Sequence, residues 1–217
     1  MRKLIFLILL FSTLARAQSD SVFVDEKYRE DQIYLNLTYI SLLNTPPAIS
    51  QSGFSFGLGG GFIRDFPLNG RRNVALGAGL GYGFNNYYFN LRYSQETPEG
   101  TESVVLNNKF MLHMLEVPLE LRLRTSTATR YKFWRFYPGF KISYVFGENL
   151  SLEKGLGFDG GQLVEYNELL YGITFSAGFN KWNIHLYYGL NDLMTNTAGN
   201  EDFGIRDFRV GLVFYVF

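Results

Sequence analysis

Hydrophobic and polar positions alternate along most of the chain with a period of two. The clearest segment is 74–84, in which every second residue is apolar or aromatic and the residues between them are Ala75 and four glycines. Only an extended strand separates two such sets, because successive side chains of a strand point to opposite faces. Six further segments alternate in the same way: 33–39, 54–62, 111–123, 134–146, 171–179 and 182–190. An eighth, 205–217, is apolar on both faces near its end, which leaves its orientation open.

The two faces of these segments differ in a way that is typical of a membrane barrel. One face is packed with Leu, Phe, Tyr and Trp, and the other combines glycines with charged residues. Each segment approaches the roughly 9–11 residues that a tilted membrane strand requires. The pattern predicts an all-β fold: a transmembrane antiparallel up-and-down β-barrel of about eight strands over 32–217, with small and polar residues inside. A secreted soluble sandwich, which would bury the apolar face, is the alternative.

The connections between the predicted strands alternate between short and long. With the N-terminus in the periplasm, the shorter connections 66–72, 125–131 and 180–181 lie on the periplasmic side. The longer connections lie outside the cell, as expected of outer-membrane barrels; they are 45–52, 94–107, 148–167 and 192–204. The C-terminus returns to the periplasm, where the terminal Phe217 is the usual recognition mark for the barrel insertion machinery.

The N-terminus has the form of a secretory signal. A basic start is followed by an almost wholly apolar run and by Ala15-Arg16-Ala17, so we expect residues 1–17 to be a signal peptide for the Sec pathway. Its removal takes away three bases and no acid, which leaves 17 basic and 20 acidic residues in the mature chain. Residues 18–31 then form a polar periplasmic arm.

Composition narrows the classes of function. The full chain holds 20 basic and 20 acidic residues, a balance that argues against a nucleic-acid partner. The lack of cysteine excludes disulfides, thiolate metal sites and thiol nucleophiles. The loops show no spacing of metal ligands, so the sequence predicts neither a metal site nor a cofactor.

Residues 115–147 carry a resemblance to a known family. The strand Leu-Glu-Val-Pro-Leu-Glu-Leu-Arg-Leu-Arg at 115–124 resembles the porin-like outer-membrane barrels of Bacteroidetes. The continuation through Thr-Ser-Thr at 125–127 and Tyr-Lys-Phe-Trp-Arg at 131–135 is similar to the PorT family within that superfamily. This resemblance implies a non-enzymatic accessory role in type IX secretion of cargo that carries a C-terminal sorting domain, and it supplies no catalytic residues.

Several charged residues fall on the predicted inner face. An eight-stranded barrel has room inside for little more than side chains, and isolated ions there are costly, so these charges should pair into a structural plug. An ion or proton path is the alternative. The set consists of Glu116, Glu120, Arg122, Arg124, Arg135, Lys141, Asp207 and Arg209.

Two histidines and one glycine motif are candidate catalytic or binding features. His113 falls on the lipid-facing side near the outer rim, where Ser94 or Ser103 with Glu96 or Glu102 could complete a lipid-modifying triad. His185 faces the lumen and is expected to bond a neighbouring polar group. The glycine pattern 155–160 matches a dinucleotide fingerprint in letters only, because no strand–helix unit surrounds it.

The predicted loops differ in charge from the predicted turns. From residue 94 onward the outer loops are strongly acidic and could bridge to lipopolysaccharide through divalent cations. The periplasmic turns are basic and could dock a type IX secretion subunit, as could the arm; the basic residues are Arg71, Arg72, Arg130, Lys132 and Lys181.

The sequence therefore predicts an outer-membrane barrel, not an enzyme, that contacts membrane lipid and supports type IX secretion. The alternatives are an envelope or adhesion barrel without a secretion role, a narrow channel and a lipid-modifying enzyme.

Overall fold

The computed structural model describes residues 31–97, 100–125, 134–152, 164–180, 182–196 and 204–216. These residues form strands and connecting turns, and none of them forms a helix long and apolar enough to cross a membrane. The strands are β1 (Gln32–Leu43), β2 (Ile49–Gln51), β3 (Phe56–Pro67), β4 (Val74–Thr97), β5 (Gly100–Arg124), β6 (Trp134–Leu152), β7 (Val164–Tyr166), β8 (Leu169–Phe179), β9 (Trp182–Gly189), β10 (Met194–Asn196) and β11 (Gly204–Val216).

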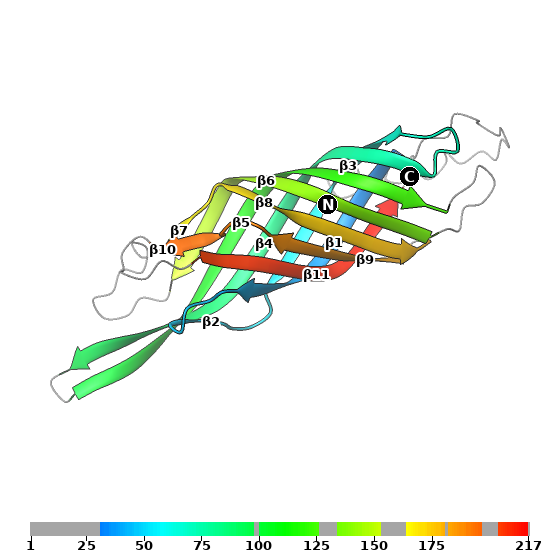
Figure 1. The fold of residues 1–217 in the computed structure, drawn as a ribbon. Helices are drawn as coiled ribbons and strands as arrows, with labels where there is room; N and C mark the ends of the chain where they lie inside the picture. Colours follow the sequence, from blue (N-terminus) through cyan, green and yellow to red (C-terminus); the bar gives the residue numbers. More distant parts are fainter. Residues whose placement is uncertain are drawn as a thin grey trace, which may run out of the picture.

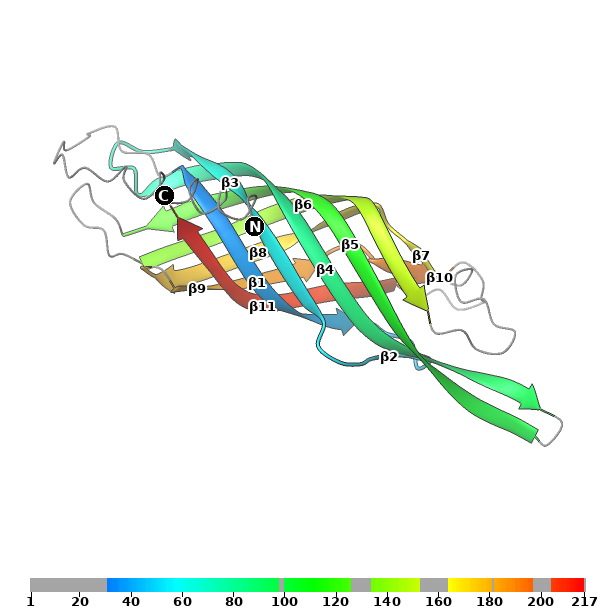
Figure 2. The same ribbon diagram turned by 180° about the vertical axis from the view of Figure 1, so that it is seen from behind.

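Eight of the described strands close into a ring. The order β1-β3-β4-β5-β6-β8-β9-β11 is antiparallel throughout, and β1 pairs β11 from Ile33↔Val216 to Leu43↔Arg206. Figures 1 and 2 show the resulting elongated barrel from two sides, with the start of β1 beside the end of β11. The predicted antiparallel up-and-down barrel of about eight strands is confirmed.

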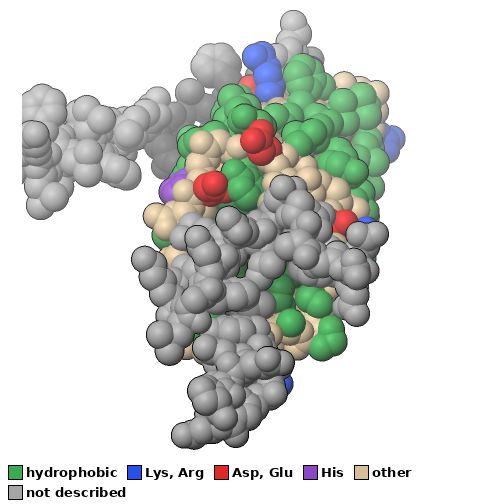
Figure 3. All heavy atoms as spheres, turned by 90° about the vertical axis from the view of Figure 1, so that its left-hand side faces the viewer, with side chains coloured by type: hydrophobic (Ala, Val, Ile, Leu, Met, Phe, Trp, Pro, Cys, Tyr) green, Lys and Arg blue, Asp and Glu red, His purple; other side chains and the backbone are tan. Residues whose placement is uncertain are grey.

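The alternating positions in the sequence correspond to side chains that point alternately to the outside of the barrel and into its lumen. Along β1, Ile33, Leu35 and Leu37 are about half exposed on the outer surface, whereas Tyr34 and Thr38 on the opposite face are buried. Hydrophobic side chains cover much of the described surface in the view along the barrel (Figure 3). Such an apolar exterior suits a hydrocarbon solvent.

The orientation of β11, which the sequence left open, is decided by its neighbours. Asp207, Arg209, Val213 and Tyr215 are buried in the lumen, and Val210 on the opposite face is exposed. Asp207 and Arg209 point inward because pairing with both β1 and β9 fixes the register of β11.

The long outer connection predicted at 94–107 is wrong. β4 and β5 continue as a paired ribbon through Ser94↔Ser103 to Thr97↔Gly100, and the ribbon projects beyond the barrel (Figures 1 and 2). The alternation of hydrophobicity is weak in this part of the sequence, so the strand signal disappears although the pairing continues. The other long connections carry the three short strands β2, β7 and β10.

The glycines of β3 and β4 allow the lumen to close tightly beside β1. A Cβ atom added at Gly81 would overlap the Tyr34 hydroxyl oxygen, and one added at Gly61 would overlap the backbone of β4. These positions therefore require glycine because aromatic side chains and backbone approach them closely.

We predict that Gly81→Val destabilises the barrel by about 2–3 kcal/mol, because the added side chain displaces Tyr34 from a packed interior. Denaturant unfolding of the protein in lipid vesicles measures the change. Ala78→Val, which adds the same kind of bulk on the outer face of the same strand, should stay within about 0.5 kcal/mol of the unmodified protein. Equal losses in the two variants would contradict the assignment of the two faces.

Candidate functional site in the barrel lumen

The lumen consists of two layers. Towards the predicted extracellular end it is filled by an apolar cluster; the cluster contains Ile40, Leu42, Ile49, Tyr87, Phe89, Phe110, Leu112, Met114, Val145, Leu170, Leu193, Met194 and Ile205. Towards the predicted periplasmic end the inner faces of β3, β5, β6 and β11 supply charges. Among the described residues, the buried charges are four acids, Asp65, Glu116, Glu120 and Asp207, and five bases, Arg122, Arg124, Arg135, Lys141 and Arg209.

The upper ion-pair cluster lies next to the apolar layer. Lys141 Nζ is 2.7 Å from Glu116 Oε1, and Arg209 Nε is 2.6 Å from Asp207 Oδ2. Arg209 also lies 4.0 Å from Glu116, which joins the two pairs. The Tyr87 hydroxyl donates a hydrogen bond of 3.2 Å to Asp207. Two acids and two bases thus neutralise one another in a space closed to water, as burial of ions demands.

The lower ion-pair cluster lies nearer the predicted periplasmic end. Arg122 bridges two acids, with NH1 2.5 Å from Asp65 Oδ1 and Nε 3.0 Å from Glu120 Oε2. Arg124 pairs with the second carboxylate oxygen of Asp65, and the Tyr215 hydroxyl donates to Glu120 at 3.4 Å. Arg122 is therefore the central residue of this cluster.

Tyrosine rings pack against the basic side chains of both clusters. The Tyr187 ring lies under both Lys141 and Arg209, at 4.9 and 4.3 Å from the ring centroid. The Arg122 guanidinium lies 5.0 Å from the centroid of Tyr137. In these cation–π contacts the tyrosine rings fill space in the lumen and also stabilise the positive charges of the arginine and lysine side chains.

Arg135 lies closest to the turn between β8 and β9. Its guanidinium donates a hydrogen bond to the Asn180 carbonyl and stands 6.0 Å from the Tyr215 ring centroid. Asn180 has a positive φ of 58°, which places it in the tight turn that follows β8. Arg135 thus ties this turn to the luminal network.

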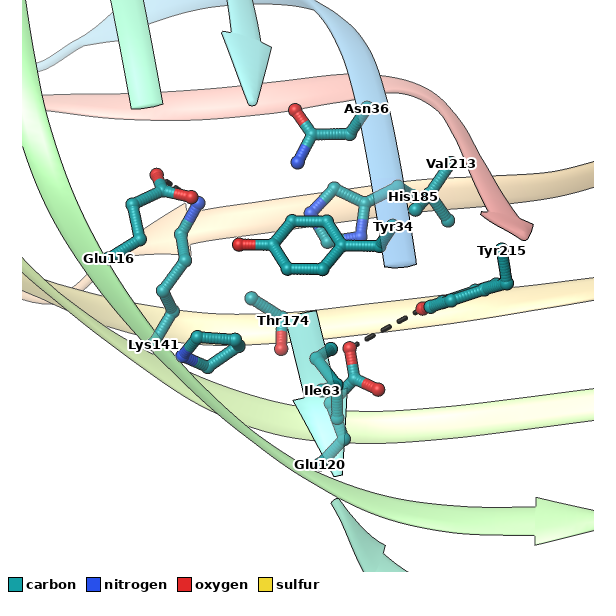
Figure 4. A pocket seen from close by; sticks show the side chains of 11 residues that line it. Tyr34, Asn36, Ile63, Glu116, Glu120, Lys141, Thr174, His185, Val213 and Tyr215 are labelled. Atoms are coloured by element: carbon teal, nitrogen blue, oxygen red, sulfur yellow. Dashed lines mark hydrogen bonds and ion pairs between the residues drawn. The ribbon is translucent and has the colours of Figure 1, made fainter. Parts of the chain in front are cut away.

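A small cavity remains between the two clusters. It has a volume of about 20 Å³ and is lined by residues that include Tyr34, Glu116, Glu120, Lys141 and His185. Figure 4 shows the Tyr34 ring extending across it between the Glu116–Lys141 pair and Glu120. This volume is about that of one water molecule. An ester or a sugar does not fit there.

The two histidines lie on opposite sides of the barrel wall. His185 is buried, with Nδ1 2.8 Å from Ser176 Oγ, and it borders the small cavity, which has no room for a substrate. His113 lies outside, with Nδ1 2.6 Å from the Tyr82 hydroxyl. The proposed outer-rim triad is wrong in geometry: Ser103 lies ten residues along β5 from His113, about 33 Å at the rise of a strand.

Asp65 and the apolar layer were missed by the sequence analysis. The glycine alternation at 57, 59 and 61 continues inward to Ile63 and Asp65, but the predicted strand stopped at residue 62. The apolar layer has a weaker signal. In 110–114 the buried Phe110, Leu112 and Met114 alternate with Met111 and His113, and neither set carries the glycines or paired charges that mark the inward face elsewhere.

The remaining predicted site residues lie at the turns and termini. Arg71 is exposed in the turn after β3, and Arg72 beside it is partly exposed with a positive φ of 54°. Several elements lie outside the described residues: Arg130, Lys132, Lys181, Phe217, the signal peptide, residues 18–30 of the arm and the glycine pattern 155–160. The described residues contain no group of three or more His, Cys, Asp or Glu able to hold a metal ion.

We predict that Arg122→Met destabilises the barrel by about 3–5 kcal/mol, because it leaves two buried carboxylates without their central partner. Urea titration in lipid vesicles measures this loss. Adding Glu120→Gln to Arg122→Met should recover part of it, since one buried charge is then removed. Arg71→Met, an exposed arginine in the turn, serves as the matched control and should change stability by less than about 0.5 kcal/mol. A small effect of Arg122→Met would mean that water solvates this layer.

Comparison with known proteins agrees with this architecture. Residues 16–195 match the family model described as outer membrane protein beta-barrel domain. A search of curated proteins finds no match to the chain. The matched segment covers most of the closed ring, its apolar exterior and much of its luminal network. The chain therefore belongs to the outer membrane protein β-barrel domain family and is a barrel of the outer membrane.

Proposed function

We propose that this protein is a non-enzymatic outer-membrane barrel that supports type IX secretion of sorting-domain cargo, as a member of the PorT family of Bacteroidetes. It reaches the periplasm through the Sec pathway by means of the signal peptide 1–17. Its barrel is a rigid scaffold, and the periplasmic turns and the arm 18–31 dock secretion subunits.

The filled lumen carries this proposal. The apolar layer and the two ion-pair clusters occupy successive levels of the barrel, and the cavity between the clusters has a volume of only about 20 Å³. Neither a polypeptide nor a hydrated ion passes such an interior without breaking several buried ion pairs, each of which is costly to break. The protein must then function through the surfaces at the two ends and on the outside of the barrel.

The sequence that resembles PorT builds this filled lumen. Glu116, Glu120, Arg122 and Arg124 all lie within 115–124 on β5, and all four point inward into the ion-pair clusters. The resemblance therefore extends to the physical feature that makes the barrel a scaffold, and it supports the accessory role over transport through the barrel.

The periplasmic end offers an ordered surface next to the arm. In the turn after β3, Arg72 donates its amide to the Asn69 carbonyl at 3.0 Å, and Asn69 bonds Asn73 at 2.6 Å, so Arg71 is presented on a fixed loop. Asp31 at the end of the arm accepts the Asp65 amide at 3.1 Å. The arm precedes β1 and the basic turn follows β3. Because β1 and β3 are antiparallel neighbours, Asp31 and this turn lie at the same end of the barrel.

We predict that deletion of the gene in the source bacterium abolishes surface delivery of sorting-domain cargo, and that the unmodified gene restores it. A copy with Arg71→Glu and Arg72→Glu should restore at most about a tenth of this delivery, because the docking turn changes the sign of its charge. Quantitative labelling of surface cargo measures this.

The matched control is Arg92→Glu with Lys109→Glu, which reverses two charges on the outside of β4 and β5 at the opposite end of the barrel and should restore full delivery. Heat-modifiable migration on gels verifies that each variant forms a barrel. Normal cargo delivery in the deletion strain would sink the secretion role and leave the envelope or adhesion barrel as the function.

A separate prediction concerns conductance. Purified protein in planar bilayers should give no stable single-channel currents, because the ion-pair clusters and the apolar layer close the lumen. Arg122→Ala combined with Phe110→Ala, which opens both layers, is the positive comparison. Regular currents from the unmodified protein would contradict the scaffold mechanism.

A further inference from the structure

An aromatic band runs around part of the barrel near its extracellular end. Successive rings lie 5.2–6.4 Å apart between centroids and come from five neighbouring elements; they are Tyr39, Phe54, Phe56, Phe84, His113 and Phe146. Aromatic girdles mark the levels at which a barrel leaves the hydrocarbon for the head groups. This band therefore marks the outer-leaflet interface, and it includes the imidazole ring of His113.

The outer face of β4 and β5 carries bases from this band outward. Cross-strand pairs place Phe84 beside His113, Tyr88 beside Lys109 and Arg92 beside Val105. Lys109 Nζ lies 5.7 Å from the Tyr88 ring centroid. Steps of four residues separate the three bases, about 13 Å each along the strand. We call His113, Lys109 and Arg92 the basic flank.

Asparagine and serine side chains lie beside the basic flank. Asn107 and Ser50 are exposed on adjacent outward positions of β5 and β2, and Asn149 and Ser151 are exposed on β6 next to Met111 and Lys109. None of the outward side chains described on β2, β4 and β5 at this level is acidic, and the exposed Glu148 of β6 pairs with the inward-facing Leu112 and hydrogen-bonds Tyr166. The flank therefore combines positive charge with amide and hydroxyl groups directly above an aromatic band.

We propose that the basic flank binds the phosphorylated glycolipid of the outer leaflet, lipid A. The acyl chains lie against the aromatic band, the Lys109 and Arg92 side chains contact the phosphates, and the asparagines and serines bond the sugar hydroxyls. Phosphate recognition by Lys and Arg is favourable because these hydrogen bonds are charge-assisted. The interaction would use the outward bases of the strands rather than cation bridges from the acidic loops.

The position of the flank selects this occupant. Its lower boundary is the level at which acyl chains meet head groups, so the flank continues the membrane surface. A phosphorylated glycolipid carries acyl chains, phosphates and sugar hydroxyls. Its acyl chains match the aromatic band, and its phosphates and hydroxyls match the bases and the amide and hydroxyl side chains above the band. The proposal is independent of a role in secretion.

Native mass spectrometry of the full-length protein purified from outer membranes tests this. We expect lipid A to remain bound to the unmodified protein. In nanodiscs, Arg92→Gln combined with Lys109→Gln should weaken binding of bisphosphorylated lipid A about tenfold, the loss expected from two exposed charge contacts. Lipid A stripped of its phosphates should bind both proteins equally weakly.

Arg64→Gln combined with Arg206→Gln is the matched control, since it removes two bases from the exterior of other strands. It should bind lipid A as the unmodified protein does. The proposal is overturned if the flank variant binds as tightly as the unmodified protein, if the control loses as much, or if dephosphorylated lipid A binds the unmodified protein with full affinity. Heat-modifiable migration confirms that both variants are folded barrels.

Discussion

The narrow interior of an eight-stranded barrel is the constraint on which the rest of this structure depends. Such a lumen holds side chains and almost no water, so every charge inside it needs a partner. Arg122 between Asp65 and Glu120, and Arg209 between Asp207 and Glu116, meet this need. Glycines on β3 and β4 leave the space that the Tyr34 side chain of β1 occupies. The small residues on these two strands and the large residue on β1 are therefore complementary in packing.

A filled lumen places the activity of the protein on its outer surfaces. The predicted extracellular half is closed by apolar side chains, which the short strands β2 and β10 help to supply through Ile49 and Met194. At the same end the β4–β5 ribbon extends the outward face of the barrel beyond the aromatic band. The predicted periplasmic end instead presents the turn after β3 and Asp31, the last residue of the arm. The two ends thus offer different chemistry to lipid and to protein partners.

The residues show why some of this was predictable and some was not. Glu116, Glu120, Arg122 and Arg124 were placed inward correctly by counting along one strand, because alternation is a local property of the backbone. Asp65 follows the same count, yet it lies beyond residue 62, where the predicted strand ended. Which acid meets which base was not predictable: Arg122 and Asp65 are 57 residues apart and meet only because the register of β3, β4 and β5 brings them together.

The sequence by itself determined the class of structure, because a period of two with lipid-suited residues on one face and glycines and charges on the other allows a membrane barrel and little else. Only the tertiary structure decided the inward face of β11, the length of the β4–β5 ribbon and the division of the lumen into an apolar and an ionic layer. These features depend on the register between strands and on closure of β1 against β11. Both are set by contacts between distant residues, which no local pattern records.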